Sequence, residues 1–216
     1  MAAKLVRNTL LAVAIGLGTL TVAPSTTAHA TTLAPLTVDQ LTDASDFIVR
    51  GTVTEVWTEV DDRGRIWTRA RVDVSETLKG PDSPDELIVD SLGGTYGSQS
   101  MHIEARAEFS VHEELLAFVS LNEHGRYVPI GKFLGKYSIR RAPDTDRQYA
   151  RTWHPKAGLK FDARFLPHPA EEHRIYLDTL LEQIQSRLDA GWDGKPIPGL
   201  SLDKLQEINT LDRRMR

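Results

Sequence analysis

The chain has 216 residues, of which 40% are hydrophobic and 26% are charged, with 26 Lys and Arg against 30 Asp and Glu. This composition is close to the globular average, so it excludes collagen-like, coiled-coil and wholly disordered proteins and favours one domain with extensions. The absence of cysteine excludes disulfides, thiolate zinc sites and a cysteine nucleophile. A net charge of −4 and a pI near 6.0 argue against a nucleic-acid partner, which would need a basic face.

Residues 1–30 have the features of a secretory signal peptide. Lys4 and Arg7 precede an apolar run, Leu10–Leu20, and Ala28–Ala30 (AHA) places small residues where a signal peptidase reads them. As a helix the run would rise only about 16 Å, against about 30 Å of membrane hydrocarbon, so a signal fits better than an anchor. We therefore expect cleavage near Ala30, no membrane span, and a periplasmic or extracellular protein.

A short helix is expected next, because Thr37 followed by Gln40 fits a capping box. From Phe47 the apolar period changes from that of a helix to that of a strand, and Gly51 interrupts the strand as at a β-bulge. A turn signal at residues 61–64 (DDRG) then predicts a long hairpin.

The second strand of this hairpin, residues 65–78, alternates between two faces. One face carries Ile66, Thr68, Ala70, Val72 and Val74, and the other carries Trp67, Arg69, Arg71 and Asp73.

Further strands are expected at residues 86–92, 113–121, 127–130 and 136–139, with glycine-containing turns between them. Five or six short strands within residues 31–140 predict a mainly β (α+β) fold. We expect a small closed antiparallel barrel of the OB-like kind, because closure removes the exposed strand edges.

The remaining chain is expected to be a helical extension of the barrel. Residues 141–168 show no clear pattern and are interpreted as an irregular insertion or loop. Residues 169–190 predict an amphipathic helix, with Pro169 in its first turn and a leucine-rich stripe. Residues 191–216 are interpreted as a linker and a short C-terminal helix.

A family resemblance supports the barrel. It rests on LTVDQLTDASDFIVRGTVTEV, VDVSETLKG, the loop around SLGG, FSVHEELLAFVS and RYVPIGKFLGKYSI, between Leu36 and Ile139. These stretches resemble an uncharacterised family of exported bacterial OB-like domains, which are similar to the netrin and metalloprotease-inhibitor barrels. Because some such domains accompany secreted metalloproteases, the resemblance implies an alternative role as a regulator or inhibitor of a secreted protease. That role would be cysteine-independent, since the chain lacks the N-terminal cysteine by which animal inhibitors reach the zinc of the enzyme. The chain also departs from the family pattern at His112, where the family usually has a glycine before the acidic residue of the fourth strand.

A second alternative, a metal-dependent hydrolase, rests on the segment HPAEEH. His168, Glu172 and His173 resemble a zinc-peptidase helix, in which two histidines four residues apart share one face. Here the histidines are five residues apart, about 140° from each other on a helix, and a proline-started helix with an acidic first turn explains the same residues.

The remaining candidate site is the polar face of the first hairpin. Trp57, Trp67, Arg69 and Arg71 would form an exposed patch of the residue types that dominate contact surfaces. The alternative is that Trp67 packs beneath the C-terminal helix. We expect a non-enzymatic binding or accessory module without catalytic residues, cofactor or metal. Its expected partner is an exported protein such as a protease, or a glycan.

Overall fold

The computed structural model describes residues 36–81, 83–161 and 167–198, with the backbone alone for residues 153–161 and 167–171. The predicted signal peptide and the predicted C-terminal helix lie outside these residues. The described residues are mainly β, with two α-helices, and none of their helices is long and apolar enough to cross a membrane.

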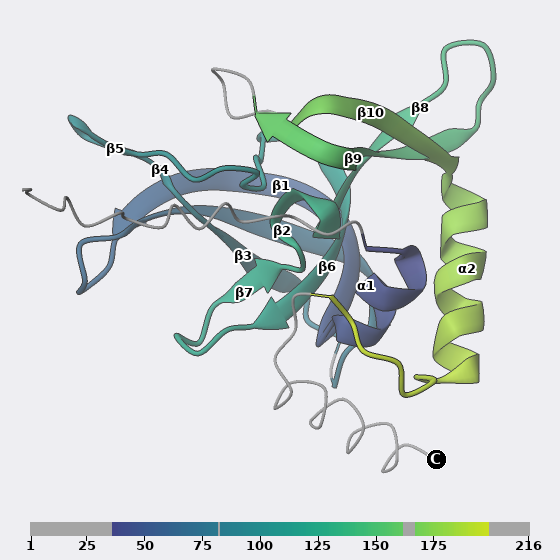
Figure 1. Ribbon diagram of the computed structural model, residues 1–216. Coiled ribbons are helices and arrows are strands. Elements are labelled where there is room, and N and C mark those ends of the chain that lie inside the picture. The colour runs from purple at the N-terminus through teal and green to yellow at the C-terminus, as the bar shows by residue number, and fades with distance from the viewer. Residues whose placement is uncertain (1–35, 82, 162–166, 199–216) are drawn as a thin grey trace, which may run out of the picture. The chain divides into compact units, whose positions relative to one another are not determined.

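The elements follow one another along the chain as shown in Figure 1. In order they are α1 (Val38–Ala44), β1 (Phe47–Val60), β2 (Ile66–Lys79), β3 (Glu86–Leu92), β4 (Gly94–Tyr96), β5 (Gln99–Met101), β6 (Glu114–Leu121), β7 (Tyr127–Pro129), the 3-10 helix η1 (Lys132–Gly135), β8 (Lys136–Arg141), β9 (Gln148–Phe161), β10 (Pro167–Tyr176) and α2 (Leu177–Ala190).

Eight of these strands form one sheet in the order β1-β2-β3-β7-β6-β8-β9-β10, and β1 also pairs with β6. The pairing of β3 with β7 is parallel and consists of the single pair Val89–Tyr127, whereas the other pairings are antiparallel. Strands β4 and β5 form a separate hairpin. The prediction of five or six strands is therefore wrong. The described residues form ten. Eight of them, including the short hairpin β4–β5, begin before residue 140, and β9 and β10 continue the large sheet beyond it.

The predicted capping box is confirmed at the start of α1. Gln40 donates its backbone N–H to Thr37 Oγ1 (3.2 Å), and Thr37 donates its own N–H to Gln40 Oε1 (3.0 Å). These two bonds satisfy donors that a helix of this length cannot satisfy internally.

The predicted bulge in β1 is also confirmed. The register of β1 against β2 shifts between Arg50 and Gly51, and a Cβ on Gly51 would lie 2.3 Å from the backbone oxygen of Asp73. Only glycine allows this approach of two backbones. The bend that results lets residues 47–52 pair with β6 while the strand continues along β2 to Val60.

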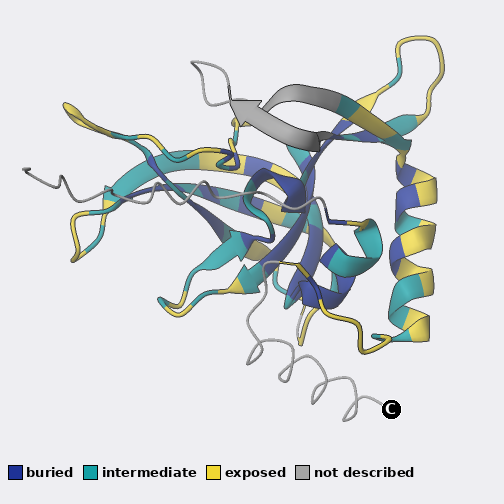
Figure 2. Cartoon of the chain, in the orientation of Figure 1, coloured by how far each residue is buried: buried dark blue, intermediate teal, exposed yellow. Residues whose placement is uncertain are grey.

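Two apolar clusters lie on opposite sides of this bent sheet. The first, beneath α1 and α2, includes Leu41, Ile48, Leu116, Phe118, Tyr137, Ile139, Leu180 and Ile184. The second joins β1, β2, β3 and β6 through Val49, Val53, Ala70, Val72, Leu87, Val89, Leu115 and Ala117. Figure 2 shows α2 buried along the side that faces the sheet and exposed along the other.

Two predictions for the C-terminal part need correction. Residues 169–176, predicted as the start of a helix, belong to strand β10, and the helix begins only at Leu177. Much of the segment 141–168, predicted as irregular, is strand β9. Pro169 fits a strand here because the register of β10 against β9 shifts between His168 and Ala170, and bulges tolerate a residue without an N–H.

Replacing Gly51 tests the bend. We expect Gly51→Ala to lower the free energy of unfolding by about 1–3 kcal/mol or more, because the added methyl group meets backbone that cannot rotate away. Urea unfolding followed by circular dichroism measures the change. The neighbouring Thr52→Ala, at an exposed position, serves as the control. Equal stabilities of Gly51→Ala and wild type would contradict the role given to this glycine.

Candidate functional site

Trp57, Arg69 and Arg71 come together on one face of the β1–β2 hairpin. Trp57 lies directly opposite Arg69 in the ladder. The guanidinium carbons of Arg69 and Arg71 lie 5.4 and 5.5 Å from the centroid of its ring. The half-buried indole is therefore clamped by two cation–π contacts.

Arg71 is also held by carboxylates on both neighbouring strands. Its Nε donates to Glu55 Oε2 (3.0 Å) and its Nη1 donates to Glu86 Oε1 (2.6 Å). These hydrogen bonds raise the pKa of Arg71 further, with the bond to Glu55 contributing most. Glu55 and Glu86 are about half exposed, so this end of the face is open to solvent.

Arg69 belongs to a closed ring of two arginines and two carboxylates. It donates to Asp90 Oδ1 (2.7 Å) and to Glu59 Oε2 (3.0 Å). Arg126, in the turn before β7, donates to the same two residues at 3.2 and 2.6 Å. Each arginine thus bridges both acids, and each acid bridges both arginines. The fork shape of guanidinium makes such double bridging specific to arginine.

The pKa values of the two acids in this ring shift in opposite directions, because Asp90 is more deeply buried than Glu59. The side chain of Asp90 is only 2% exposed, and burial raises its pKa although Arg69 and Arg126 act in the opposite direction. Burial also acts to raise the pKa of Glu59, but hydrogen bonds from Arg126 and Arg69 prevail and lower it. Asp90 is therefore the buried anchor on which the two arginines depend.

Trp67 is not an exposed contact residue, and this prediction is corrected. It is only 4% exposed, because the guanidinium groups of Arg126 and Arg65 lie over its ring at 4.9 and 5.4 Å from the centroid. It does not pack beneath α2 either, since the buried side of α2 packs in the first apolar cluster, which does not include Trp67. Arginines from two turns cover the ring, and a single sequence could not reveal that arrangement.

Asp61 orients Trp67 from the hairpin turn. Its carboxylate accepts hydrogen bonds from Trp67 Nε1 (2.9 Å), from Arg65 Nε (2.7 Å) and from the backbone N–H groups of Arg63 and Arg65. Burial acts to raise the pKa of Asp61, but the bonds from Trp67 and Arg65 prevail and hold it well below its usual range.

These contacts define a single surface, which we call the hairpin face. It consists of Glu55, Trp57, Glu59, Arg69, Arg71, Glu86 and Arg126. The buried side chains of Trp67 and Asp90 contact these residues and hold them in place. Arg126 was missed from the sequence because it follows β2 by nearly fifty positions. In the sequence, Arg126 is recognisable only as a charged residue beside a predicted turn, a position where surface residues are common.

The proposed hydrolase residues do not form a zinc-peptidase helix, because their segment is a strand. Glu172 and His173 are successive residues of β10, and successive side chains of a strand point to opposite faces. Glu172 accepts a hydrogen bond from Arg174 and pairs with Arg151. The side chain of His168 lies outside the described part. Among the described residues, no group of three or more acidic or histidine side chains could hold a metal ion.

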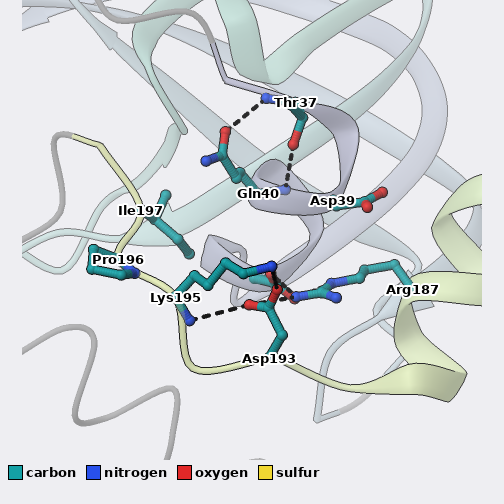
Figure 3. Close-up of a pocket in the computed structure, with 9 residues that line it drawn as sticks. Thr37, Asp39, Gln40, Arg187, Asp193, Lys195, Pro196 and Ile197 are labelled. Atoms are coloured by element: carbon teal, nitrogen blue, oxygen red, sulfur yellow. Dashed lines mark hydrogen bonds and ion pairs between the residues drawn. The ribbon is translucent and has the colours of Figure 1, made fainter.

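A polar pocket of about 210 Å³ lies between α1, α2 and the segment after α2 (Figure 3). This is below the usual volume of a small-molecule site. Its charges are bound to one another. Arg187 donates to both carboxylate oxygens of Asp43 (2.9 and 2.6 Å) and lies 3.4 Å from Asp193, which also pairs with Lys195. We interpret this cluster as the fastening between α1 and α2.

The bonds to Asp61 predict a dependence of stability on pH. Because its pKa is lowered by folding, the ionised Asp61 stabilises the fold above its ordinary pKa of 3.8, and this contribution is lost as the pH falls through the folded-state value. We expect Asp61→Asn to be less stable than wild type at neutral pH, with a smaller difference near pH 2. Urea unfolding at both pH values measures this. For Asp62→Asn, at the exposed neighbouring position, the difference in stability from wild type should be the same at both pH values.

No family model and no curated protein sequence matches the chain. The resemblance to exported OB-like domains therefore stays a prediction, and function has to be argued from the geometry of the chain itself.

Proposed function

We propose that this protein is an exported, non-enzymatic binding or accessory module that contacts another exported protein through the hairpin face. The observation that carries this proposal is the clamping of Trp57 between Arg69 and Arg71 on a surface that solvent reaches. Tryptophan and arginine are the residue types that most often supply the binding energy of protein interfaces.

Preorganisation of these side chains supports a contact role. Long side chains normally lose conformational freedom when a partner binds, at about 0.5–1.5 kcal/mol for each one immobilised. Here Arg71 is already held by Glu55 and Glu86, and Arg69 by Glu59 and Asp90. A partner would find the guanidinium groups and the indole in place.

The pattern of charge on the face supports a protein as the partner. Carboxylates and guanidinium groups alternate across β1, β2 and β3, so the face has no large field of one sign. A polyanion would meet Glu55 and Glu86 at the most exposed end. A protein surface with its own mixed charges can pair with both signs.

We also propose that the strands around the second apolar cluster form an OB-like barrel. The pairings β1–β2, β2–β3, β3–β7, β7–β6 and β6–β1 make a ring that returns to its starting strand. OB folds are five-stranded and partly open. The single pair between Val89 and Tyr127 would be the open seam.

Export predicts a shortened chain. Produced in a host with a general secretory pathway, the protein should accumulate outside the cytoplasm as a chain that begins at or near Thr31, because we expect cleavage near Ala30. Intact-mass measurement gives the new N-terminus. Charged residues in the apolar run, Leu11→Arg with Ile15→Arg, should leave the full chain in the cytoplasm. A full-length chain outside the cytoplasm would contradict cleavage.

Binding through the hairpin face predicts a specific loss of affinity. The purified protein is immobilised, exported proteins of the native host are passed over it, and a retained protein is then purified for titration calorimetry. We expect Trp57→Ala to raise the Kd for that protein at least about 30-fold. Arg71→Gln should also weaken binding, whereas Arg63→Gln, the same charge change at an exposed turn residue, should not.

Two further readouts define the outcome. Circular dichroism and thermal unfolding must show that each variant is folded. If the retained protein is a protease, inhibition or activation of its peptidase activity distinguishes a regulator from a passive accessory. Equal affinities for Trp57→Ala and wild type would contradict the hairpin face as the contact surface.

A further inference from the structure

Strands β8, β9 and β10 lie side by side at one edge of the sheet (Figure 1). The described side chains on one face of these strands include an excess of arginine. The strand register sets Tyr149 between Arg140 and Tyr176, and it sets Arg151 opposite Arg174. Residues directly opposite in an antiparallel sheet share a face, so these side chains lie on one side of the sheet. We call this surface the arginine face and define it as Arg140, Tyr149, Arg151, Arg174 and Tyr176.

The arginine face is electrostatically unbalanced, unlike the hairpin face. Arg151 and Arg174 lie opposite each other, which is unfavourable for like charges, and both pair with the single carboxylate of Glu172. Arg140 is exposed and forms no ion pair with any described residue. Burial is the main cause that lowers the pKa of Lys136 on the same strand, and the charge of Arg140 lowers it further. This surface is therefore locally positive, although the whole chain has a net charge of −4.

Aromatic rings lie among these charges. The guanidinium carbon of Arg174 is 5.2 Å from the centroid of Tyr149. At the end of the face the guanidinium carbon of Arg147 is 3.6 Å from the centroid of Tyr176, and Arg147 also pairs with Asp178. Tyr176 is nevertheless 46% exposed. Each tyrosine thus offers a flat apolar surface with a hydroxyl group beside a fixed cation.

We propose that the arginine face binds an acidic polysaccharide. Guanidinium forks pair with carboxylates through two hydrogen bonds, so Arg140, Arg151 and Arg174 can take the acid groups of uronic-acid residues. The rings of Tyr149 and Tyr176 can pack against the apolar faces of the sugars. This proposal concerns a different surface from the hairpin face and does not depend on the protein contact proposed there.

Charge complementarity favours this occupant over denser polyanions. Nucleic acids carry a charge at every phosphate and are bound by domains with a broadly basic surface. This chain has a pI near 6.0, and among the described side chains of β8, β9 and β10 the positive excess consists of Arg140, Arg151 and Arg174. A polymer with spaced carboxylates matches so small a patch with less repulsion from the rest of the protein.

The test uses polygalacturonate as the acidic polymer and dextran as a neutral one, with affinity gel electrophoresis and calorimetry at two salt concentrations. Wild type should bind polygalacturonate and should not bind dextran. Arg151→Gln with Arg174→Gln should weaken binding at least about tenfold, because hydrogen bonds between charged groups are lost. Tyr176→Ala should also weaken it, although the net charge is unchanged.

A matched control distinguishes binding at the arginine face from nonspecific attraction of the acidic polymer to positive charge. Arg63→Gln with Lys195→Gln removes the same charge at exposed positions elsewhere and should leave binding unchanged. Equal weakening by this pair would overturn the proposal, as would no binding by wild type. Tighter binding of single-stranded DNA or of vesicles with anionic lipid than of polygalacturonate would overturn the choice of a polysaccharide. Thermal unfolding confirms that each variant is folded.

Discussion

Strand β1 has two neighbours along its first half, and its bend at Gly51 makes this possible. With β6 on one edge and β2 on the other, the strand forms part of both apolar clusters, through Ile48 on one side and Val49 on the other. Beyond the bend it leaves β6 and continues with β2 alone towards the turn at Asp61. The hairpin face lies on this continuation, so the site depends on a backbone contact too close for any Cβ.

The arginines of the hairpin face and those of the arginine face differ in how many carboxylates surround them. On the hairpin face every arginine is matched by carboxylates, and buried Asp90 fixes Arg69 and Arg126 in one geometry. Such a face is rigid and nearly neutral, which suits recognition of a shaped protein surface. On β8–β10 the described arginines exceed their described carboxylate partners, and this excess is the basis of the proposed binding of an acidic polymer. The same residue type is structural in one place and available in the other.

Local patterns in the sequence predicted several elements well. The capping box at Thr37, the bulge at Gly51 and the alternating faces of β2 depend on neighbouring residues, and the structure confirms them. The segment before Leu177 was predicted as helix because Pro169 and the acidic residues after it fit a first turn as well as a strand. Its pairing with β9 outweighs that local preference, and pairing between segments does not appear in local periodicity.

The sequence by itself determined that the chain is mainly β, that Arg69 and Arg71 share one face of their strand, and that no cysteine chemistry is available. These conclusions follow from composition and from the two-residue period of a strand, which act over short distances. Tertiary structure alone decided that Trp67 is covered, because Arg126 reaches it from the turn before β7. It also decided that Asp90 is buried between two arginines and that Arg151 faces Arg174. Each of these depends on contacts between segments far apart in the chain, and such contacts fix burial and charge balance.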